Sequence, residues 1–395
     1  MALQGGEPVR KTRLPYGHQW IDREDIQAAA GALQTEWITQ GPAVEKFEKA
    51  VAEYTGVRYA VAISSGTAAL HAACAAAGLR SGDEAVTSPL SFVATANAVV
   101  YCGAKPVFAD IDEETLTINP GEIKKKISPS TKALLTVDFA GHPCQADEIR
   151  EIARERNLIV IEDAAHALGA RYKEKIIGGQ ADMTVLSFHP VKHITTGEGG
   201  MVLTNEAEFY EKLKRFRHHG ITLNPSEGPW AYDIGELGYN FRITDFQCAL
   251  GLRQLTKLDS FVKRRRTIAE RYTEAFGLRP EIKIPTAAKW AGHAYHLYVI
   301  QLNLDQLSCS RREIFEALRA ENIGVQVHYV PVHFFRYYQD HFDCRAKQYP
   351  VTERYYEKAI TLPLFPKMSD DDAADVIKAV SKILDYYTVQ SKGKG

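Results

Sequence analysis

The stretch of sequence that decides the fold, residues 183–204, reads MTVLSFHPVKHITTGEGGMVLT. It contains two short apolar runs, residues 183–188 and 201–204, which are joined by a loop with His189-Pro190 and four residues that are mostly glycine. Apolar runs of this length between turn residues are typical of buried strands. The stretch therefore predicts two strands, with a single lysine, Lys192, in the loop between them.

Lys192 is the candidate reactive group of this loop. A lysine just past a buried strand loses part of its hydration, which lowers its pKa and leaves some free amine near neutral pH. A free amine attacks aldehydes and forms Schiff bases. Most lysines in loops are solvated surface residues, so the reactive interpretation depends on what the rest of the chain supplies.

The composition is that of an ordinary soluble protein. The 395 residues are 45% hydrophobic and 25% charged, and this length allows two domains with a sizeable core. The net charge of −1 gives no reason to expect nucleic acid or a membrane surface as a partner. The six cysteines form no CxxC pair, which indicates free thiols in a reducing compartment and no zinc site. We therefore expect a cytoplasmic enzyme that binds no metal.

Seven strand patterns alternate mostly with helical patterns in the first part of the chain. The strands are expected at 59–63, 84–88, 107–109, 133–137, 158–161, 183–188 and 201–204. This alternation predicts an α/β domain whose largely parallel, seven-stranded sheet is covered on both faces. Ligands of such sheets bind beyond the carboxyl ends of the strands. Four candidate residues lie at or just past such ends: Thr67, Asp163, Ser187 and Lys192.

The character of the sequence changes near residue 260. A basic helical pattern is followed by proline-punctuated segments, with strands expected at 296–302 and 325–329 and helices at 311–321 and 370–387. We therefore predict a large α/β domain, residues 1–260, and a smaller α+β domain, residues 261–395. Residues 1–20 are expected to form an N-terminal arm that is loose over its first 13 residues.

The turn after the first strand, residues 64–67, reads Ser-Ser-Gly-Thr and opens a helix rich in alanine. Backbone N–H groups and the helix dipole at such a turn bind phosphate. The alternative is a plain helix cap, in which Ser or Thr satisfies the first N–H groups. No G-x-G-x-x-G follows a strand and no G-x-x-x-x-G-K-[ST] occurs, so neither nucleotide-binding fingerprint is present.

These features together suit pyridoxal 5′-phosphate (PLP). This cofactor needs an amine for its aldehyde, an anion against its ring nitrogen, a phosphate cradle and a group packed on its ring. Lys192 can be the amine and Asp163 the anion, while Phe92 or His166 can pack on the ring. Taken singly, Asp163 could equally be a helix cap or part of a surface pair, and His166 a hydrogen-bonded core histidine.

Five stretches resemble the DegT/DnrJ/EryC1/StrS family of PLP-dependent sugar aminotransferases, which have the type I fold of aspartate aminotransferase. They are SSGTAAL (64–70), SPLSFVATANA (88–98), EDAAHALGA (162–170), SFHPVKHITTGEGG (187–200) and GYNFRITDFQCALGLRQL (238–255). These stretches span most of the first 260 residues. The pattern departs at His193, where proline is expected.

The resemblance implies a role for each matching residue. Those implied for catalysis are Lys192, Asp163 and His166. Those implied for holding PLP are Gly66, Thr67, Phe92, Ser187 and, from the partner subunit, Asn240. Those implied for contacting a sugar nucleotide are Tyr16, Arg242 and His328. Because Asn240 would reach the phosphate of the neighbouring subunit, the resemblance implies a homodimer with shared active sites.

Two further stretches narrow the substrate. HLYVI (296–300) and VQVHYVPVHFFRYYQ (325–339) are similar to family members that aminate C4 of a UDP-linked 4-keto-6-deoxy-N-acetylhexosamine in pseudaminic acid biosynthesis, with glutamate as the amino donor. Family members that act on dTDP-, GDP- or other UDP-linked keto sugars share nearly all the motifs and are the alternative. Lys192 argues against a dehydratase of this fold, which carries histidine there. Lys192 and Asp163 together argue against a non-catalytic regulatory protein.

Overall fold

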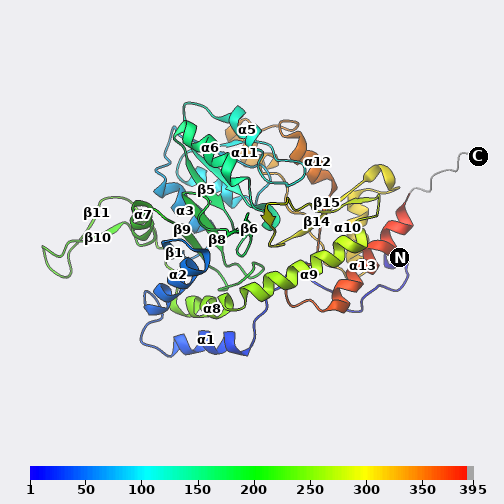
Figure 1. Cartoon of the computed structure of the whole chain (residues 1–395), viewed down its shortest axis with the longest axis horizontal. Helices are drawn as coiled ribbons and strands as arrows, with labels where there is room; N and C mark the ends of the chain where they lie inside the picture. The colour runs from blue at the N-terminus through cyan, green and yellow to red at the C-terminus, as the bar shows by residue number, and fades with distance from the viewer. Residues whose placement is uncertain (389–395) are drawn as a thin grey trace, which may run out of the picture.

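A seven-stranded sheet forms the centre of the molecule in the computed structural model, which describes residues 1–388 (Figure 1). Its strand order is β1-β9-β8-β5-β4-β2-β3. The strands are β1 (Tyr59–Ile63), β2 (Glu84–Thr87), β3 (Lys105–Phe108), β4 (Thr131–Val137), β5 (Ile159–Asp163), β8 (Met183–Ser187) and β9 (Gly200–Thr204). In this sheet β9 pairs antiparallel with β1 and β8, whereas the other pairs are parallel. The predicted α/β fold with a largely parallel, seven-stranded sheet is confirmed.

Helices cover both faces of this sheet. One face packs against α3 (Gly66–Ala76), α4 (Ala94–Tyr101) and α7 (Ala207–Arg217). The other packs against α2 (Pro42–Thr55), α5 (Pro120–Lys126), α6 (Ala146–Arg156) and α8 (Asp245–Leu255). Side chains alternate between the faces of a strand: in β8, Met183 and Val185 join the first core and Leu186 joins the second. Burial on both faces explains why these strands are continuous apolar runs.

A second, antiparallel sheet of three strands lies in the C-terminal part, in the order β12-β14-β15. These strands are β12 (Ile282–Lys283), β14 (Tyr298–Leu302) and β15 (Ala359–Leu362), and they share a core with α9 (Leu258–Phe276), α10 (Arg311–Ala320) and α13 (Asp370–Tyr387). The smaller elements are α1 (Arg23–Leu33), α11 (Arg336–Phe342), α12 (Pro350–Lys358) and the strands β6 (Arg171–Tyr172), β7 (Lys175–Ile176), β10 (Ile221–Leu223), β11 (Tyr232–Ile234) and β13 (Ala291–Gly292). Within residues 1–388, no helix combines the length and apolar character that crossing a bilayer requires.

Helix α9 joins the two parts of the molecule, as Figure 1 shows along its lower right. Its Leu258 and Val262 pack in the core of α2 and α8. Its Ile268 and Tyr272 pack in the C-terminal core. The predicted boundary between residues 260 and 261 therefore falls inside one helix, and the division into two domains stays a prediction.

The strand expected at residues 325–329 does not form. The segment makes one isolated bridge, between Gln326 and Thr361, and otherwise runs as a loop beside β15. Its apolar pattern was interpreted as a strand because valine and tyrosine favour sheets. Instead, the loop turns His328 and Tyr329 toward a cavity at the edge of the central sheet.

The first residues of the arm are held against the C-terminal part, so the expectation that they are loose was wrong. The backbone N–H groups of Ala2 and Val9 donate to the carboxylate of Glu321 at 2.9 and 2.8 Å. Arg10 pairs with Asp372 and Asp375 on α13, at 2.8 and 2.7 Å. The side chain of Glu321 is fully buried, and a buried carboxylate needs donors. The arm supplies two of these donors, and Lys382 on α13 supplies a third at 2.9 Å.

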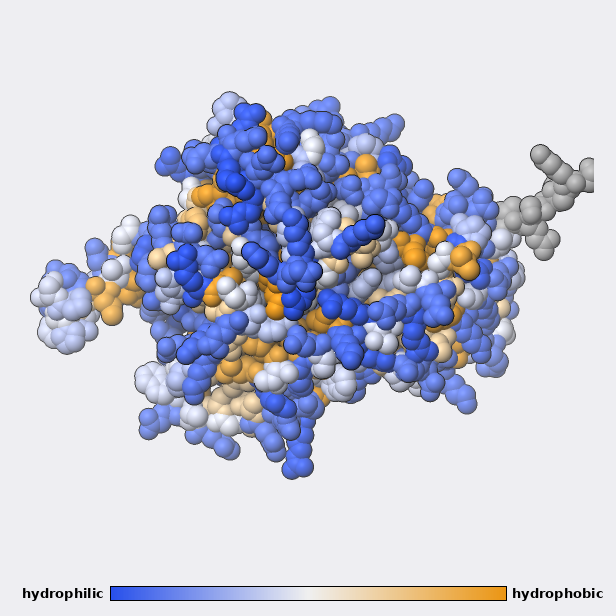
Figure 2. All heavy atoms as spheres, viewed as in Figure 1, coloured by the Kyte–Doolittle hydropathy of each residue, from blue (hydrophilic) through white to orange (hydrophobic). Residues whose placement is uncertain are grey.

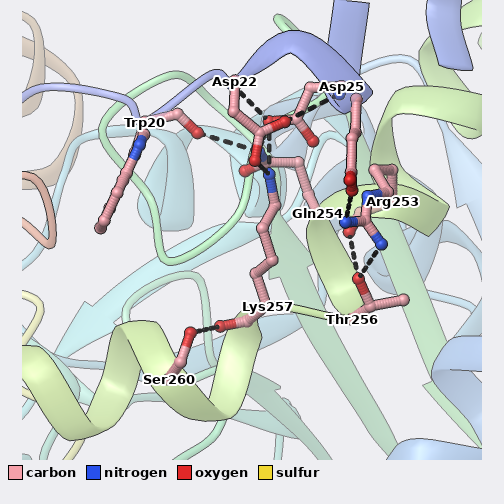
Figure 3. A network of polar contacts seen from close by, with 9 residues as sticks. Trp20, Asp22, Asp25, Arg253, Gln254, Thr256, Lys257 and Ser260 are labelled. Atoms are coloured by element: carbon pink, nitrogen blue, oxygen red, sulfur yellow. Dashed lines mark hydrogen bonds and ion pairs between the residues drawn. The ribbon is translucent and has the colours of Figure 1, made fainter. Parts of the chain in front are cut away.

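Helix α1 lies along α8 and is held by a buried polar network at the start of α9 (Figure 3). Asp25 is 0% exposed, and its Oδ2 accepts from Lys257 Nζ at 2.5 Å and from Gln254 Nε2 at 2.8 Å. Lys257 also donates to Asp22 at 2.9 Å. A buried charge is stabilised by such pairing and is costly without it.

We expect Asp25→Ala to lower the free energy of unfolding by about 3 kcal/mol, because it leaves Lys257 and Gln254 without their buried acceptor. Urea unfolding measures the change. The matched control is Glu24→Ala on the same helix, which removes an ion pair with Arg253 in which Glu24 is 61% exposed; it should cost under about 1 kcal/mol. Equal losses in the two variants would contradict the assigned role of the network.

Candidate active site

A cavity of about 400 Å³ lies at the edge of the sheet where six strands have their carboxyl ends. Because these strands run in one direction, the turns that follow them meet there. Among the residues that line the cavity are seven that the sequence predicted for one site: Gly66, Thr67, Phe92, Asp163, His166, Ser187 and Lys192. The chain thus brings together residues that are up to 126 positions apart, from Gly66 to Lys192.

Lys192 stands in a turn after β8, where its backbone N–H donates to the carbonyl of His189 at 2.9 Å. Burial lowers the pKa of Lys192 to about 8, an effect that the nearby charge of Asp163 opposes and that of Arg265 reinforces. At such a pKa both the neutral amine and the ammonium are populated near neutral pH. The side chain can therefore act as a nucleophile and can take up or release a proton.

Asp163 is the last residue of β5 and is buried. Its Oδ2 accepts from the Thr95 hydroxyl at 2.6 Å, and its Oδ1 accepts from the Ala165 backbone N–H at 3.1 Å. Burial raises the pKa of Asp163, while these two hydrogen bonds and the charge of Lys192 oppose the rise. The carboxylate is thus held in one orientation at the cavity wall. Sequence reasoning missed Thr95, although it lies within the SPLSFVATANA stretch.

The N-terminus of α3 is pressed against the end of β8. Gly66 is the first residue of this helix and Ser65 is its cap, with Oγ accepting from Ala68 N–H at 3.1 Å. A Cβ on Gly66 would lie 2.9 Å from Cβ and 3.0 Å from Oγ of Ser187. A Cβ on Gly200 would overlap the carbonyl of Ser65. Glycine at both positions lets the helix N-terminus, whose N–H groups attract anions, reach the cavity.

His166 is a buried, neutral histidine in this cavity. Burial lowers its pKa well below the usual value, and the charge of Lys192 adds to the effect. Its Nε2 lies 3.2 Å from the hydroxyl of Tyr329, and its ring lies 4.3 Å from that of His296. Phe92 is 56% exposed at the mouth of the cavity. Tyr329 and His296 were not predicted as site residues; the only signal in the sequence is their place in the two stretches after residue 295.

Two of the predicted sugar-nucleotide residues, Tyr16 and His328, also line the cavity. Their rings are 5.3 Å apart, and His328 Nδ1 lies 2.8 Å from the Thr361 hydroxyl. Burial lowers the pKa of His328 to about 3, so this side chain is neutral. The backbone carbonyl of Tyr16 accepts from Leu364 N–H at 3.1 Å, which places the arm over the cavity.

The structure does not bring Asn240 or Arg242 to Lys192 within one chain. Asn240 is exposed and makes a bridge with His218. The Nη1 of Arg242 lies 2.9 Å from Nδ1 of His218, and both side chains line a larger, more open cavity of about 570 Å³ beside α7. This second cavity is larger, but it holds none of the seven residues named above.

His193 occupies the position where proline was expected. Its side chain is buried, and its Nε2 lies 3.2 Å from the carbonyl of Ala294. The substitution thus links the Lys192 loop to the segment that precedes β14. Burial lowers the pKa of His193 well below the usual value, and the positive charge of Arg265 lowers it further.

The sequence profile of the DegT/DnrJ/EryC1/StrS aminotransferase family matches residues 19–381. The chain belongs to this family. It is 43% identical to the spore coat polysaccharide biosynthesis protein SpsC of Bacillus subtilis over 94% of this chain and 97% of that protein. It is 38% identical to the UDP-4-amino-4,6-dideoxy-N-acetyl-β-L-altrosamine transaminase of Campylobacter jejuni over 94% and 98% of the two chains.

This chain has the same fold as solved structures of sugar aminotransferases. The aminotransferase PseC of Helicobacter pylori, involved in the biosynthesis of pseudaminic acid, superposes with a TM-score of 0.90 at 32% identity and covers 95% of this chain and 100% of its own. The sugar aminotransferase Spr1654 of Streptococcus pneumoniae in its PLP form has a TM-score of 0.89 at 28% identity, over 95% and 99% of the chains. The family predicted from the motifs is confirmed.

We expect Thr95→Val to destabilise the protein by about 1.5–3 kcal/mol near neutral pH, because the Asp163 carboxylate loses a charge-assisted hydrogen bond. Burial already raises the pKa of Asp163 above its unfolded value, and the lost donor raises it further. The difference between variant and wild type should therefore grow as pH rises through the Asp163 pKa and shrink as pH falls below it, because the carboxyl is then protonated in both proteins.

Urea unfolding at about pH 4 and about pH 8 tests this dependence. The matched control is Thr87→Val, because the buried Thr87 hydroxyl donates to the Leu135 carbonyl at 2.8 Å and has no titrating partner. Its cost should not change with pH. A pH-independent cost for Thr95→Val would show that the hydroxyl does not act on the carboxylate.

Proposed function

We propose that this protein is a PLP-dependent aminotransferase that moves an amino group from glutamate to C4 of a UDP-linked 4-keto-6-deoxy-N-acetylhexosamine. One observation carries the chemistry: Lys192, Asp163 and the N-terminus of α3 face a single cavity. The sugar assignment is supported by 38% identity to the altrosamine transaminase and by the likeness to PseC.

The residues of the cavity fit PLP by charge and by shape. The glycine-lined N-terminus of α3 offers N–H groups to a phosphate beside Ser187. Asp163, held by Thr95 and Ala165, would keep a proton on the ring nitrogen. When bound, PLP supplies an electron sink for breaking the bond between the donor Cα and its hydrogen. Phe92 and His166 would pack against the ring.

Lys192 would move the proton in both halves of the reaction. With a pKa lowered to about 8 by burial, its amine can accept a proton from the donor carbon and its ammonium can return one to the acceptor carbon. The neutral side chains of His166 and His328 keep additional positive charge away from this amine. One residue thus serves as base and then as acid.

The substrate would enter through an outer chamber of about 340 Å³ that shares Tyr16, Phe92 and His328 with the inner cavity and adds Gln326 and Phe335. Within residues 1–388 the two chambers are lined by aliphatic, aromatic, polar and histidine side chains, with Asp163, Lys192 and Glu198 as the charged ones. A sugar diphosphate needs cations, and this lining offers Lys192 alone. The remaining positive charge would come from Arg242 of a second copy.

We therefore infer a homodimer with shared sites, in which Asn240 and Arg242 reach the neighbouring cavity. The hairpin β10–β11, which projects at the left of Figure 1, carries side chains that are at least half exposed: Leu223, Trp230, Tyr232 and Ile234. Figure 2 shows further apolar surface beside α8, between α1 and α2. Adjoining exposed apolar side chains are a feature of protein–protein contact sites.

Another nucleotide-linked keto sugar is the second candidate substrate. The 43% identity to SpsC, a spore coat polysaccharide biosynthesis protein, exceeds the 38% identity to the altrosamine transaminase, so likeness to the transaminase does not fix the sugar. Both candidate reactions would use PLP and glutamate. They would differ only in the nucleotide sugar that the outer chamber binds. A panel of UDP-, dTDP- and GDP-linked 4-keto sugars with glutamate separates them, and amination of a dTDP- or GDP-sugar alone would reject the UDP assignment.

The cofactor assignment predicts a visible absorption band from a Schiff base at Lys192. After borohydride reduction, peptide mass spectrometry should find the cofactor on Lys192 in the wild type and on no residue in Lys192→Ala. Lys173→Ala, which removes an exposed lysine paired with Asp147, is the control and should keep the adduct. An adduct that survives in Lys192→Ala would overturn the assignment.

The shared-site assignment predicts complementation between two inactive variants. Lys192→Ala and Asn240→Ala homodimers should each lose most activity. A mixed dimer contains one site with both residues intact, so mixing should restore up to about a quarter of wild-type activity per subunit if subunits exchange at random. Native mass spectrometry confirms exchange; mixed dimers without recovered activity would contradict the crossing of Asn240.

A further inference from the structure

Three consecutive arginines on α9 point in three directions. Arg264 lies near the surface and donates to the Met368 carbonyl at 2.7 Å and to Asp370 at 2.8 Å. Arg266 donates to the His293 carbonyl at 2.9 Å. Arg265, between them, is 1% exposed and is among the largest fully buried side chains of the described residues. A guanidinium in the interior requires a physical reason, since burying a charge is costly.

The partners of Arg265 are backbone carbonyls. Its Nη1 donates to Leu364 O at 2.8 Å, to His296 O at 3.2 Å and to Tyr295 O at 3.3 Å. Its Nη2 lies 3.5 Å from Val191 O. Burial lowers the pKa of Arg265 to about 9, and among residues 1–388 no carboxylate opposes the effect. A guanidinium stays protonated at neutral pH, so an unneutralised positive charge lies inside the protein.

The carbonyls of Val191, Tyr295 and His296 belong to segments that supply a residue to the cavity, and Leu364 is hydrogen-bonded to the cavity residue Tyr16. Val191 immediately precedes Lys192. His296 itself lines the cavity. Leu364 donates its N–H to the carbonyl of Tyr16 and accepts from Arg265, so it connects the guanidinium to the arm. One side chain therefore ties together the backbone behind three parts of the site.

The positive charge of Arg265 also affects the protonation of the Lys192 amine. Of the charged groups that act on Lys192, Asp163 favours the ammonium and Arg265 disfavours it. The rings of His166 and His193 lie 4.3 and 5.6 Å from that of His296, and burial lowers the pKa of all three, so this cluster adds no positive charge near the amine. The two charges thus act on the amine in opposite directions.

We infer that Arg265 is a positioning residue for Lys192: it holds the backbone of the Lys192 loop and places an unneutralised positive charge behind the amine. The inference rests on the proposed function in that Lys192 is taken as the reacting amine. It goes beyond that function because it assigns control of this amine to a residue outside the cavity.

The test measures the titration of Lys192 in the full-length protein, freed of any carbonyl compound with hydroxylamine. Trace acetylation over a range of pH, followed by mass spectrometry of the Lys192 peptide, gives the midpoint. We expect a midpoint near 8 in the wild type. Arg265→Met should raise it by about one pH unit, because a neighbouring like charge is removed.

Three further variants make the result specific. Arg265→Gln is a second, polar replacement, so that the outcome does not depend on one substitution folding. Arg264→Gln and Arg266→Gln remove charges from the same helix and should leave the midpoint within about 0.3 unit. Near-ultraviolet circular dichroism confirms that each variant is folded. If Arg265 had a purely structural role, replacing it would lower the stability of the protein without moving the titration midpoint of Lys192.

Because acetylation needs neither cofactor nor sugar, the test separates the two proposals. An unchanged midpoint in folded Arg265→Met or Arg265→Gln would overturn the role of Arg265, even if the protein is an aminotransferase. An ordinary lysine midpoint in the wild type would overturn it as well. A raised midpoint in a protein that forms no adduct with PLP would support Arg265 and reject the proposed function alone.

Discussion

The close approach of the α3 N-terminus to the ends of β8 and β9 is the constraint on which the rest of the site depends. It requires glycine at residues 66 and 200, because a Cβ at either position would meet Ser187 or the Ser65 carbonyl. The N-terminus of α3 therefore directs its N–H groups toward the cavity. At the same cavity β5 ends in Asp163, and the loop after β8 carries Lys192. A phosphate site, an anion and an amine thereby share one small volume.

Desolvation then decides what these groups can do. Lys192 is partly buried and Asp163 is buried, and burial moves the pKa of each toward neutrality. The attraction between the two groups opposes both shifts, and the hydrogen bond from the Thr95 hydroxyl also lowers the pKa of Asp163. The positive charge of Arg265 lowers the pKa of Lys192 further. In a medium of low dielectric constant such interactions are stronger than in water. The local charge pattern, rather than the near-zero net charge of the chain, therefore controls the site.

The single chain builds the inner half of the site more completely than the outer half. Its inner cavity holds the residues predicted for the cofactor, whereas Asn240 and Arg242 lie elsewhere, beside His218. The exposed apolar side chains of the β10–β11 hairpin lie in the same region of the chain. In the proposed homodimer, a second copy would cover this surface and supply Arg242 to the neighbouring cavity, which would link assembly to substrate binding.

The sequence by itself determined the fold class and the family, and it predicted nine of the residues that line the inner cavity, but not Thr95, His296 or Tyr329. Apolar runs at 59–63 and 183–188 became β1 and β8 because strands buried on both faces need no alternation. Motifs such as EDAAHALGA carried Asp163 and His166 because each lies within a few residues of a strand end. Prediction from the sequence failed where long-range contacts outweigh the local pattern. Residues 325–329 have the pattern of a strand yet form a loop. The N-terminal arm is held by Glu321, which is more than 300 residues away in sequence.

Only the tertiary structure decided which charges are buried. In the sequence, Lys263 to Arg266 form a basic run of a kind that is usually solvated, and nothing distinguishes Arg265 from its neighbours. In the folded chain Arg265 contacts the carbonyls of Leu364 and Val191, whereas Arg264 and Arg266 bond to Met368 and His293. Periodicity and motif can locate a reactive lysine, but its surroundings depend on segments brought together from residues 16, 191, 296 and 364, which only folding places around it.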